Sequence, residues 1–318
     1  MSSKKKRRRQ GYRPPAKAAP PATRRPTKSR QPERRPGLLG GLFGTPTPAS
    51  MSAMPAVRAS LGRGFLLAGS TPALVLLPFA WTLVTWLLLQ AFGHIGSPLV
   101  LAQSVALPPL SVSSDFQSAL LTFGAPTGIY AVLPILIVRA VVIALLAGLV
   151  VEGFERGSVT LEGARRGLRA MPLVLAAVVL SLLSVIVLVY SGLLGPGLGT
   201  LLQVLVPAAT LWILGFVPFA AVSENRPLAV TLSRSYYGAR TPGGRQFLFS
   251  MLYLLLLTVL QALTPGVEIT ANPRPVTWAF ILAVNYIHVG FFAAYGYRWL
   301  VIAPSVSVPA APARSRRR

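Results

Sequence analysis

The run from Ile129 to Val151 decides the fold class; it reads IYAVLPILIVRAVVIALLAGLVV. Arg139 is the one charged residue within it. An α-helix satisfies its own backbone hydrogen bonds and rises about 1.5 Å per residue, so roughly 20 apolar residues cross the hydrocarbon core of a bilayer. The run therefore predicts a transmembrane helix.

Similar runs recur along the chain and predict an all-α, polytopic transmembrane bundle of about six spans. The six runs are approximately Thr71–Phe92, Ile129–Val151, Pro172–Leu193, Leu198–Val222, Phe247–Leu263 and Val276–Val301. Shorter basic stretches lie between some of them. We interpret these stretches as amphipathic cytoplasmic elbow helices.

Composition divides the chain into three parts. Of 318 residues, 31 are Lys or Arg, 7 are Asp or Glu, and 53% are hydrophobic. Residues 1–50 are rich in basic residues, Pro and Ala, which predicts a disordered basic cytoplasmic tail because little apolar surface is available for burial. Residues 51–303 form the predicted six-helix transmembrane domain, and residues 304–318 form a basic cytoplasmic C-terminal tail.

The distribution of cations predicts the orientation, because short loops rich in Lys and Arg stay in the cytoplasm. Nearly all cations fall in residues 1–70, 152–171, 223–246 and the C-terminal end, whereas the predicted outer segments contain only Arg274. We therefore expect a multi-pass protein of the cell membrane with its N- and C-termini in the cytoplasm.

Two of the basic loops resemble each other at an offset of 71 residues. At that offset Val159-Thr160-Leu161 recurs as Val230-Thr231-Leu232, Gly167 recurs as Gly238, and Arg169 recurs as Arg240. A duplication and a chance identity both explain matches in so short a window. We interpret them as traces of an internal repeat of about 71 residues.

The repeat unit is expected to be an elbow helix followed by a transmembrane hairpin. In the first elbow, Ser158 is the expected N-cap, and the apolar face contains Leu161, Ala164, Leu168 and Met171. A third copy is expected around Val57, Leu61 and Gly64. Internal repeats suit a pseudo-symmetric transporter, but the anchoring of basic loops to anionic lipid explains the pattern more simply.

One loop between two predicted spans resembles the loops of a known family. It runs from Glu155 to Gly167 and has the sequence ERGSVTLEGARRG. A second copy runs from Val217-Pro218-Phe219 through Ser233-Arg234-Ser235 to Phe247. The pattern is similar to a poorly characterised group of bacterial six-helix integral membrane proteins that includes the membrane domain fused to some glycerophosphoryl diester phosphodiesterases. The resemblance covers residues 55–303 and implies the fold without an activity, because no phosphodiesterase catalytic domain is expected here.

Arg139 is the central residue of a candidate intramembrane polar site. A charge at the bilayer centre costs about 3 kcal/mol or more unless it meets a partner or water. Asn285 and His288, three residues apart, share a helix face and are its candidate partners, together with Tyr286, Gln90 and Gln203. Arg139 either holds an anionic group, such as a lipid phosphate or a substrate carboxylate, or locks helix packing through neutral amides and carbonyls.

Basic residues in the loops are candidate contacts for anionic phospholipid headgroups. They are Arg165, Arg166, Arg169, Arg234 and Arg240. The basic chain ends could bind nucleic acid by charge alone, but topology and lipid binding explain them more simply, so no specific nucleic acid partner is expected. A second copy of the chain or another membrane protein is a further expected partner.

The residue inventory argues against an enzyme. The chain has no cysteine and only two histidines, so no catalytic, metal or cofactor site is predicted. Glu152, Glu155 and Glu162 form the only close group of acids and are expected to pair with neighbouring arginines. The leading prediction is a non-enzymatic membrane protein with a lipid-interacting, scaffolding or accessory role; the alternative is a transporter or permease component for an anionic or amphipathic solute.

Overall fold

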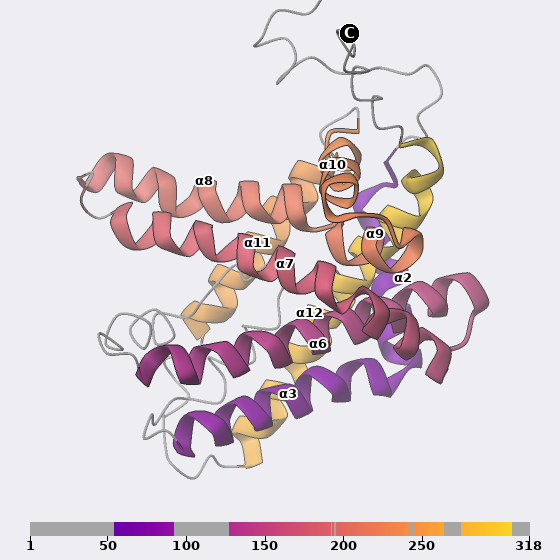
Figure 1. Cartoon of the computed structure of the whole chain (residues 1–318), viewed down its shortest axis with the longest axis horizontal. Helices are drawn as coiled ribbons and strands as arrows, with labels where there is room; N and C mark the ends of the chain where they lie inside the picture. Colours follow the sequence, from indigo (N-terminus) through magenta and orange to yellow (C-terminus); the bar gives the residue numbers. More distant parts are fainter. Residues whose placement is uncertain are drawn as a thin grey trace, which may run out of the picture. The chain divides into compact units, whose positions relative to one another are not determined.

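The computed structural model describes residues 54–91, 127–191, 193, 195–241, 245–263 and 275–306. All regular structure in these ranges is helical (Figure 1), which confirms the all-α prediction. The predicted N-terminal tail, most of the C-terminal tail and the loop that follows the first run lie outside the described residues.

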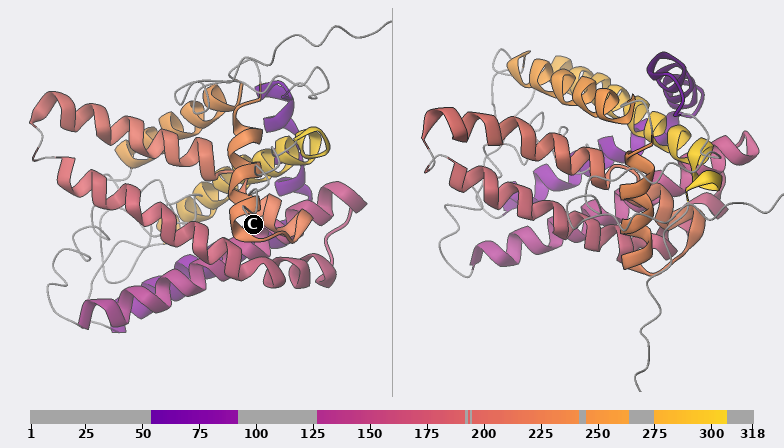
Figure 2. Two further views of the ribbon diagram at one scale, coloured as in Figure 1. Left: turned by 45° about the horizontal axis from the view of Figure 1, so that its top comes forward. Right: turned by 90° about the horizontal axis from the view of Figure 1, so that it is seen from above.

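The helices occupy all six predicted runs. In chain order they are α2 (Val57–Ser70), α3 (Pro72–Ala91), α6 (Thr127–Arg156), α7 (Leu161–Ser191), α8 (Pro196–Leu214), α9 (Val217–Glu224), α10 (Leu228–Ala239), α11 (Arg245–Leu263), α12 (Pro275–Ile302) and the short 3-10 helix η3 (Ala303–Ser305). Figures 1 and 2 show the long helices α6, α7 and α8 passing back and forth beside one another.

Among the residues that the structure describes, three stretches are long and apolar enough to cross a membrane. They are Leu136–Arg156, Leu205–Glu224 and Trp278–Ser305. A fourth candidate is the pair α2 and α3, which bends by 81° between Val57–Ser70 and Pro72–Val84. The chain therefore has the helices of a membrane protein, whereas the count of six spans stays a prediction.

Small residues form the contact face of the hairpin between α6 and α7. Gly148 of α6 faces Gly163 and Gly167 of α7, and Gly167 lies against the backbone of Ala144. A Cβ atom at Gly167 would collide with the Ala144 carbonyl oxygen, so glycine alone permits this approach. Close backbone contact gains dispersion energy along the length of the hairpin, as in other helix pairs with small residues at the interface.

Small residues also form the contact between α2 and α12. Ser60, Gly64 and Ala68 lie four residues apart on one face of α2 and are buried. A Cβ atom at Gly64 would collide with the carbonyl oxygen of Gly290 on α12. The helix that precedes the first long run is therefore held against the last helix of the chain.

The α6–α7 hairpin corrects two details of the first predicted elbow. The elbow is not a separate helix, because α7 continues without a break from Leu161 to Ser191. The N-cap is Thr160 and not Ser158, since the Thr160 hydroxyl oxygen accepts a hydrogen bond from the backbone N–H of Glu162 at 3.2 Å. The other two expected elbows, α2 and α10, are separate helices.

The internal repeat is not confirmed. Thr160 precedes the first residue of α7, whereas its counterpart Thr231 is the fourth residue of α10. The two threonines therefore hold different positions in their helices. The residue run Leu198–Val222 is also not one straight helix, because a turn at Gly215 and Phe216 separates α8 from α9.

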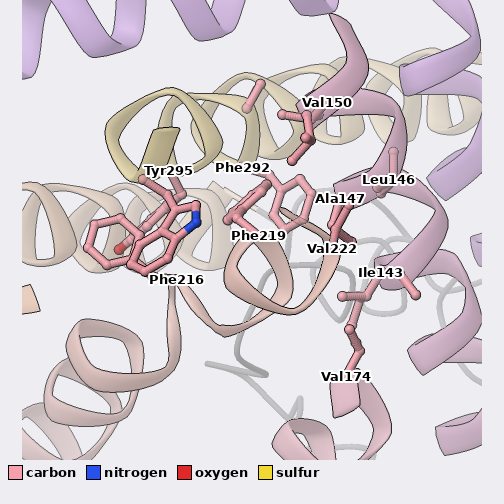
Figure 3. Close-up of a cluster of buried hydrophobic side chains, with 14 of the residues drawn as sticks. Ile143, Leu146, Ala147, Val150, Val174, Phe216, Phe219, Val222, Phe292 and Tyr295 are labelled. Carbon is pink, nitrogen blue, oxygen red and sulfur yellow. The ribbon is translucent and has the colours of Figure 1, made fainter. Parts of the chain in front are cut away.

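Large side chains fill the space between α6, α9 and α12. Figure 3 shows Val150 and Ala147 of α6 on the side of Phe219 and Phe292, and Ile143 of α6 beside Val222 of α9 and Val174 of α7. The ring centroids of Phe219 and Phe292 lie 4.7 Å apart. This aromatic contact joins α9 to the last helix and so positions the polar groups described below.

We expect G167A to destabilise the protein, since the new methyl group meets backbone atoms that cannot move aside. Overpacking of this kind costs about 1–3 kcal/mol. Thermal unfolding in detergent measures it as a Tm that falls by several degrees. G62A is the matched control: Gly62 also lies inside a helix, but a Cβ there meets nothing within 4 Å. G62A should leave the Tm unchanged or raise it, because Ala favours the helix over Gly; equal losses in the two variants would contradict this account.

Candidate functional site

Charged residues gather at one end of the bundle, which we call the basic end. It comprises α2, the end of α6, the start of α7, α9, α10 with the residues that flank it, the start of α11 and the end of α12 (Figure 1). Every described cation except Arg139 belongs to these elements: Arg58, Arg63, Arg156, Arg165, Arg166, Arg169, Arg226, Arg234, Arg240, Arg245 and Arg298. At the other end, the turn between α7 and α8 carries no charged side chain.

Glu152 organises the turn between α6 and α7. Its carboxylate is fully buried and accepts hydrogen bonds from the backbone N–H of Thr160 at 2.8 Å and of Gly163 at 2.9 Å. The Thr160 hydroxyl donates to its other oxygen at 2.6 Å. An anion at a helix N-terminus is favourable because the first N–H groups have no partner within the helix. Glu152 is therefore a structural cap for α7.

Two predicted pairings of the acids with arginines are confirmed. Arg156 pairs with Glu152 at 3.3 Å, and Arg166 pairs with Glu155 at 2.8 Å. Both pairs join the end of α6 to itself or to α7. These two acids are therefore engaged in ion pairs, and Glu152 also in helix capping.

Arg298 is a fully buried cation that the sequence analysis placed only near the inner end of the last helix. Its Nε donates to the Gln246 side-chain oxygen at 2.8 Å, and its Nη1 donates to the Ser60 hydroxyl at 3.3 Å. Its guanidinium also lies 4.6 Å from the centroid of the Phe249 ring. Neutral partners from α2 and α11 thus hold this cation and join three helices.

A second group of charges surrounds Glu224 at the end of α9. The Glu224 side chain is only 13% exposed, and one carboxylate oxygen, Oε2, pairs with the Nε atoms of both Arg226 and Arg234. Arg234 is buried and also donates to the backbone carbonyl oxygens of Ala303 and Val306. These contacts fasten α10 to the chain that follows α12.

The predicted intramembrane residues lie within one buried region, with a tyrosine that the sequence analysis missed. The Tyr253 hydroxyl of α11 hydrogen-bonds to His288 Nδ1 of α12 at 2.9 Å. Arg139 of α6 is 3% exposed and lies near Tyr253. The sequence feature that indicates a polar role for Tyr253 is its position as the single tyrosine in the leucine-rich run of residues 251–257.

Asn285 and His288 have further hydrogen-bonding capacity. Asn285 is fully buried, and neither polar atom of its side chain has a hydrogen-bond partner among the described residues. His288 Nε2 is likewise without a partner in that part of the chain. Tyr286 lies elsewhere, since its ring packs against Phe65 of α2. The side chains of the other two expected neighbours, Gln90 and Gln203, lie outside the described residues.

The five arginines predicted to contact anionic lipid fall into two groups. Arg165 and Arg169 are exposed, and Arg166 is partly exposed and pairs with Glu155. Arg234 is buried with its donors occupied by protein atoms, and Arg240 donates to the Tyr236 hydroxyl at 3.1 Å. Of this set, the exposed pair on α7 is best placed to meet a headgroup.

A cleft with a volume of about 640 Å³ opens at the basic end. It contains both charged and apolar groups, from α2, α6, α9, α10, α12 and η3. Its walls are formed by Arg63, Phe154, Glu155, Ser223, Glu224, Arg226, Arg234, Tyr297, Leu300, Val301, Ala303 and Pro304. The sequence analysis did not identify this cleft, because its residues come from distant parts of the chain.

Comparison with protein-family models, curated proteins and solved structures finds no match for this chain. The resemblance to the membrane domain of glycerophosphoryl diester phosphodiesterases therefore stays a prediction. Among the described residues, no three His, Asp or Glu side chains are grouped so that they could hold a metal ion. The arrangement offers cationic, anionic and hydrogen-bonding groups that suit binding.

We expect Y253F to lower the stability of the protein, because it removes the hydroxyl that pairs with His288 and leaves the buried Nδ1 atom unsatisfied. Such a loss costs about 1–3 kcal/mol. Y237F is the control, since the Tyr237 hydroxyl makes no hydrogen bond within the described structure. Thermal unfolding in detergent should give a lower Tm for Y253F only. An unchanged Tm would mean that the hydrogen bond contributes nothing to stability.

Proposed function

We propose that this chain is a non-enzymatic integral membrane protein of the cell membrane, a helical scaffold with a lipid-interacting or accessory role. It crosses the bilayer six times, with both termini in the cytoplasm. Its basic end lies at the cytoplasmic face and attracts anionic phospholipid headgroups, and its apolar flanks meet lipid or a membrane protein partner, including a second copy.

The separation of charge along the bundle carries this proposal. Eleven of the twelve described cations lie at the basic end, and the opposite turn is uncharged. Positive charge on short loops is retained on the cytoplasmic side, and anionic lipid attracts it there. Exposed apolar residues along the helices, such as Leu248, Leu252 and Leu255 of α11, suit contact with acyl chains.

Internal partners for buried charges support a scaffold. Arg298 is held by Gln246 and Ser60 on two other helices, and Arg139 lies close to Tyr253 on another. Polar contacts of this kind between helices fix the packing of a bundle in a bilayer. We infer that both arginines serve the arrangement of the helices.

A transporter or permease component for an anionic or amphipathic solute is the second candidate. One observation favours it: the fully buried Asn285 side chain has hydrogen-bonding capacity that no described residue uses, one helical turn from His288. Polar groups at such depth commonly line solute pathways. In this alternative Arg139 supplies the attraction for the anion.

The chain has no natural cysteine, so single-cysteine variants can report on topology without background. We expect R165C to react with a membrane-impermeant maleimide only in inside-out vesicles, because α7 begins at the cytoplasmic face. L193C should react only from the outer side, since Leu193 is 81% exposed at the opposite end of the bundle. Labelling of both variants from the same side would exclude the proposed orientation.

N285C separates the two candidate functions in the same assay. A scaffold keeps this position dry, so a small cationic methanethiosulfonate reagent should leave N285C unmodified in native vesicles while it modifies R165C or L193C from the accessible side. A solute pathway admits water to this depth. Modification of N285C in the folded protein would therefore support the transporter and overturn the scaffold.

R165Q/R169Q tests the attraction of the basic end for anionic lipid. Each cation at a membrane surface contributes about 1 kcal/mol, so loss of both should reduce phosphatidylglycerol retention in native mass spectrometry by roughly fivefold or more. R165K/R169K is the matched control, because it keeps both charges, and it should retain phosphatidylglycerol as the unmodified chain does. Equal retention by the two variants would remove lipid attraction from the proposal.

A further inference from the structure

The cleft at the basic end contains charges of both signs beside an apolar wall. Arg63, Arg226 and Arg234 provide cations, and Glu155 and Glu224 provide anions. A volume of about 640 Å³ lies within the range of roughly 300–1,000 Å³ that is typical of small-molecule sites. The cleft is therefore large enough for a ligand, and its charges restrict which ligand is complementary.

The cationic side of the cleft has N–H donors that are not used by the described residues. Arg63 of α2 is exposed and makes no ion pair or hydrogen bond with any described residue. The Arg226 side chain is 52% exposed, and its one ion pair with a described residue joins its Nε atom to Glu224 at 3.2 Å. A guanidinium presents several N–H donors in a planar fork that matches phosphate oxygens. Both arginines can bind a phosphate while Arg226 keeps its ion pair.

The anionic side has a matching acceptor. Both arginine contacts of Glu224 go to Oε2, and Oε1 accepts no hydrogen bond from the described residues. The Glu224 side chain is only 13% exposed and its carboxylate oxygens are buried, so solvation of the carboxylate by water is restricted. A buried carboxylate oxygen favours a charged N–H donor, and a primary ammonium group provides three.

The apolar wall completes the site. Leu300, Val301 and Pro304 lie at the end of α12 and in η3, and the rings of Phe154 and Tyr297 pack against each other with centroids 5.6 Å apart. A bare anion bound in this cleft would meet two carboxylates, and a bare cation would meet three guanidinium groups. A zwitterion that carries a phosphate, an ammonium and an apolar portion satisfies all three surfaces.

We propose that the cleft binds the headgroup of an aminophospholipid of the phosphatidylethanolamine type. The phosphate lies between Arg63 and Arg226, and the primary ammonium donates to Glu224 Oε1. The first carbons of the lipid lie against Leu300 and Val301. This inference rests on the proposed function, because the basic end must lie at the level of the headgroups for the lipid to reach the cleft.

Native mass spectrometry of the full chain with an equimolar mixture of dioleoyl phosphatidylethanolamine, phosphatidylcholine and phosphatidylglycerol tests it. We expect phosphatidylethanolamine to be retained about fivefold over each of the others, as for one charged hydrogen bond that is partly exposed to water. Phosphatidylcholine carries a cation without N–H donors, and phosphatidylglycerol carries no ammonium group. Equal retention of the three lipids would overturn the assignment.

R63Q and R58Q provide the matched pair of variants. Both remove an exposed arginine from α2, but only Arg63 lines the cleft. R63Q should lower phosphatidylethanolamine retention about fivefold, and R58Q should not change it, with equal Tm values for the two. Equal effects of the two variants would mean that the lipid binds by net charge and not in the cleft.

E224Q tests the ammonium contact. It keeps the shape of the side chain and should abolish the preference for phosphatidylethanolamine over phosphatidylcholine while total lipid retention persists. Glu224 also holds Arg234, so the Tm is measured in parallel. If E224Q does not fold, the comparison of R63Q with R58Q decides the proposal. A preference that survives in folded E224Q would overturn the role of Glu224.

Soluble phosphoethanolamine separates a lipid from a free metabolite. Added at the concentration of the lipid, it should leave lipid retention unchanged because it lacks the carbons that contact the apolar wall. Displacement of the lipid would overturn the lipid assignment in favour of a soluble ligand. The cysteine labelling experiment reports on topology alone, so loss of lipid selectivity with intact sidedness would overturn this inference and leave the proposed function standing.

Discussion

The close approach of helix backbones at glycine is the constraint on which the rest of this structure depends. Gly148, Gly163 and Gly167 let α6 and α7 pack backbone to backbone, and Gly64 does the same for α2 against α12. In a bilayer the hydrophobic effect does not drive one helix against another, so dispersion at close range has to hold such pairs together. Helices that touch in this way place their ends at fixed positions, and the polar groups at those ends follow.

The charged groups of the basic end are consequences of that packing. Glu152 reaches the first N–H groups of α7 because the hairpin turn is tight. Ser60 reaches Arg298 because α2 lies on α12. Glu224 and Arg234 meet because the chain breaks twice between α8 and α10, which folds two short helices over the end of the last one. The contacts of Glu224 and Arg234 thus hold helices together at this end of the bundle, and the same two residues line the cleft.

The buried site around Arg139 differs in character from the basic end. The described polar residues of this region are neutral: Tyr253 and His288 are joined by a hydrogen bond, and Asn285 lies one turn from His288. A cation among neutral dipoles can serve helix packing or attract an anion, and the two functions require different access of water. The cleft at the basic end, in contrast, presents side chains of both signs of charge.

The sequence by itself determined the helical class, the positions of the six long apolar runs and the concentration of cations in a few short segments. These properties are local, because hydropathy and charge act over one or two helical turns. Only the tertiary structure decided that α7 absorbs the first elbow, that Thr160 and not Ser158 is its cap, and that Arg234 turns inward to Glu224. It also decided which distant residues share the cleft. Glycine is neither polar nor strongly apolar, so contacts between glycine faces cannot be predicted from hydropathy. An arginine in a basic segment gives the same sequence signal whether its partner is a lipid or a buried carboxylate.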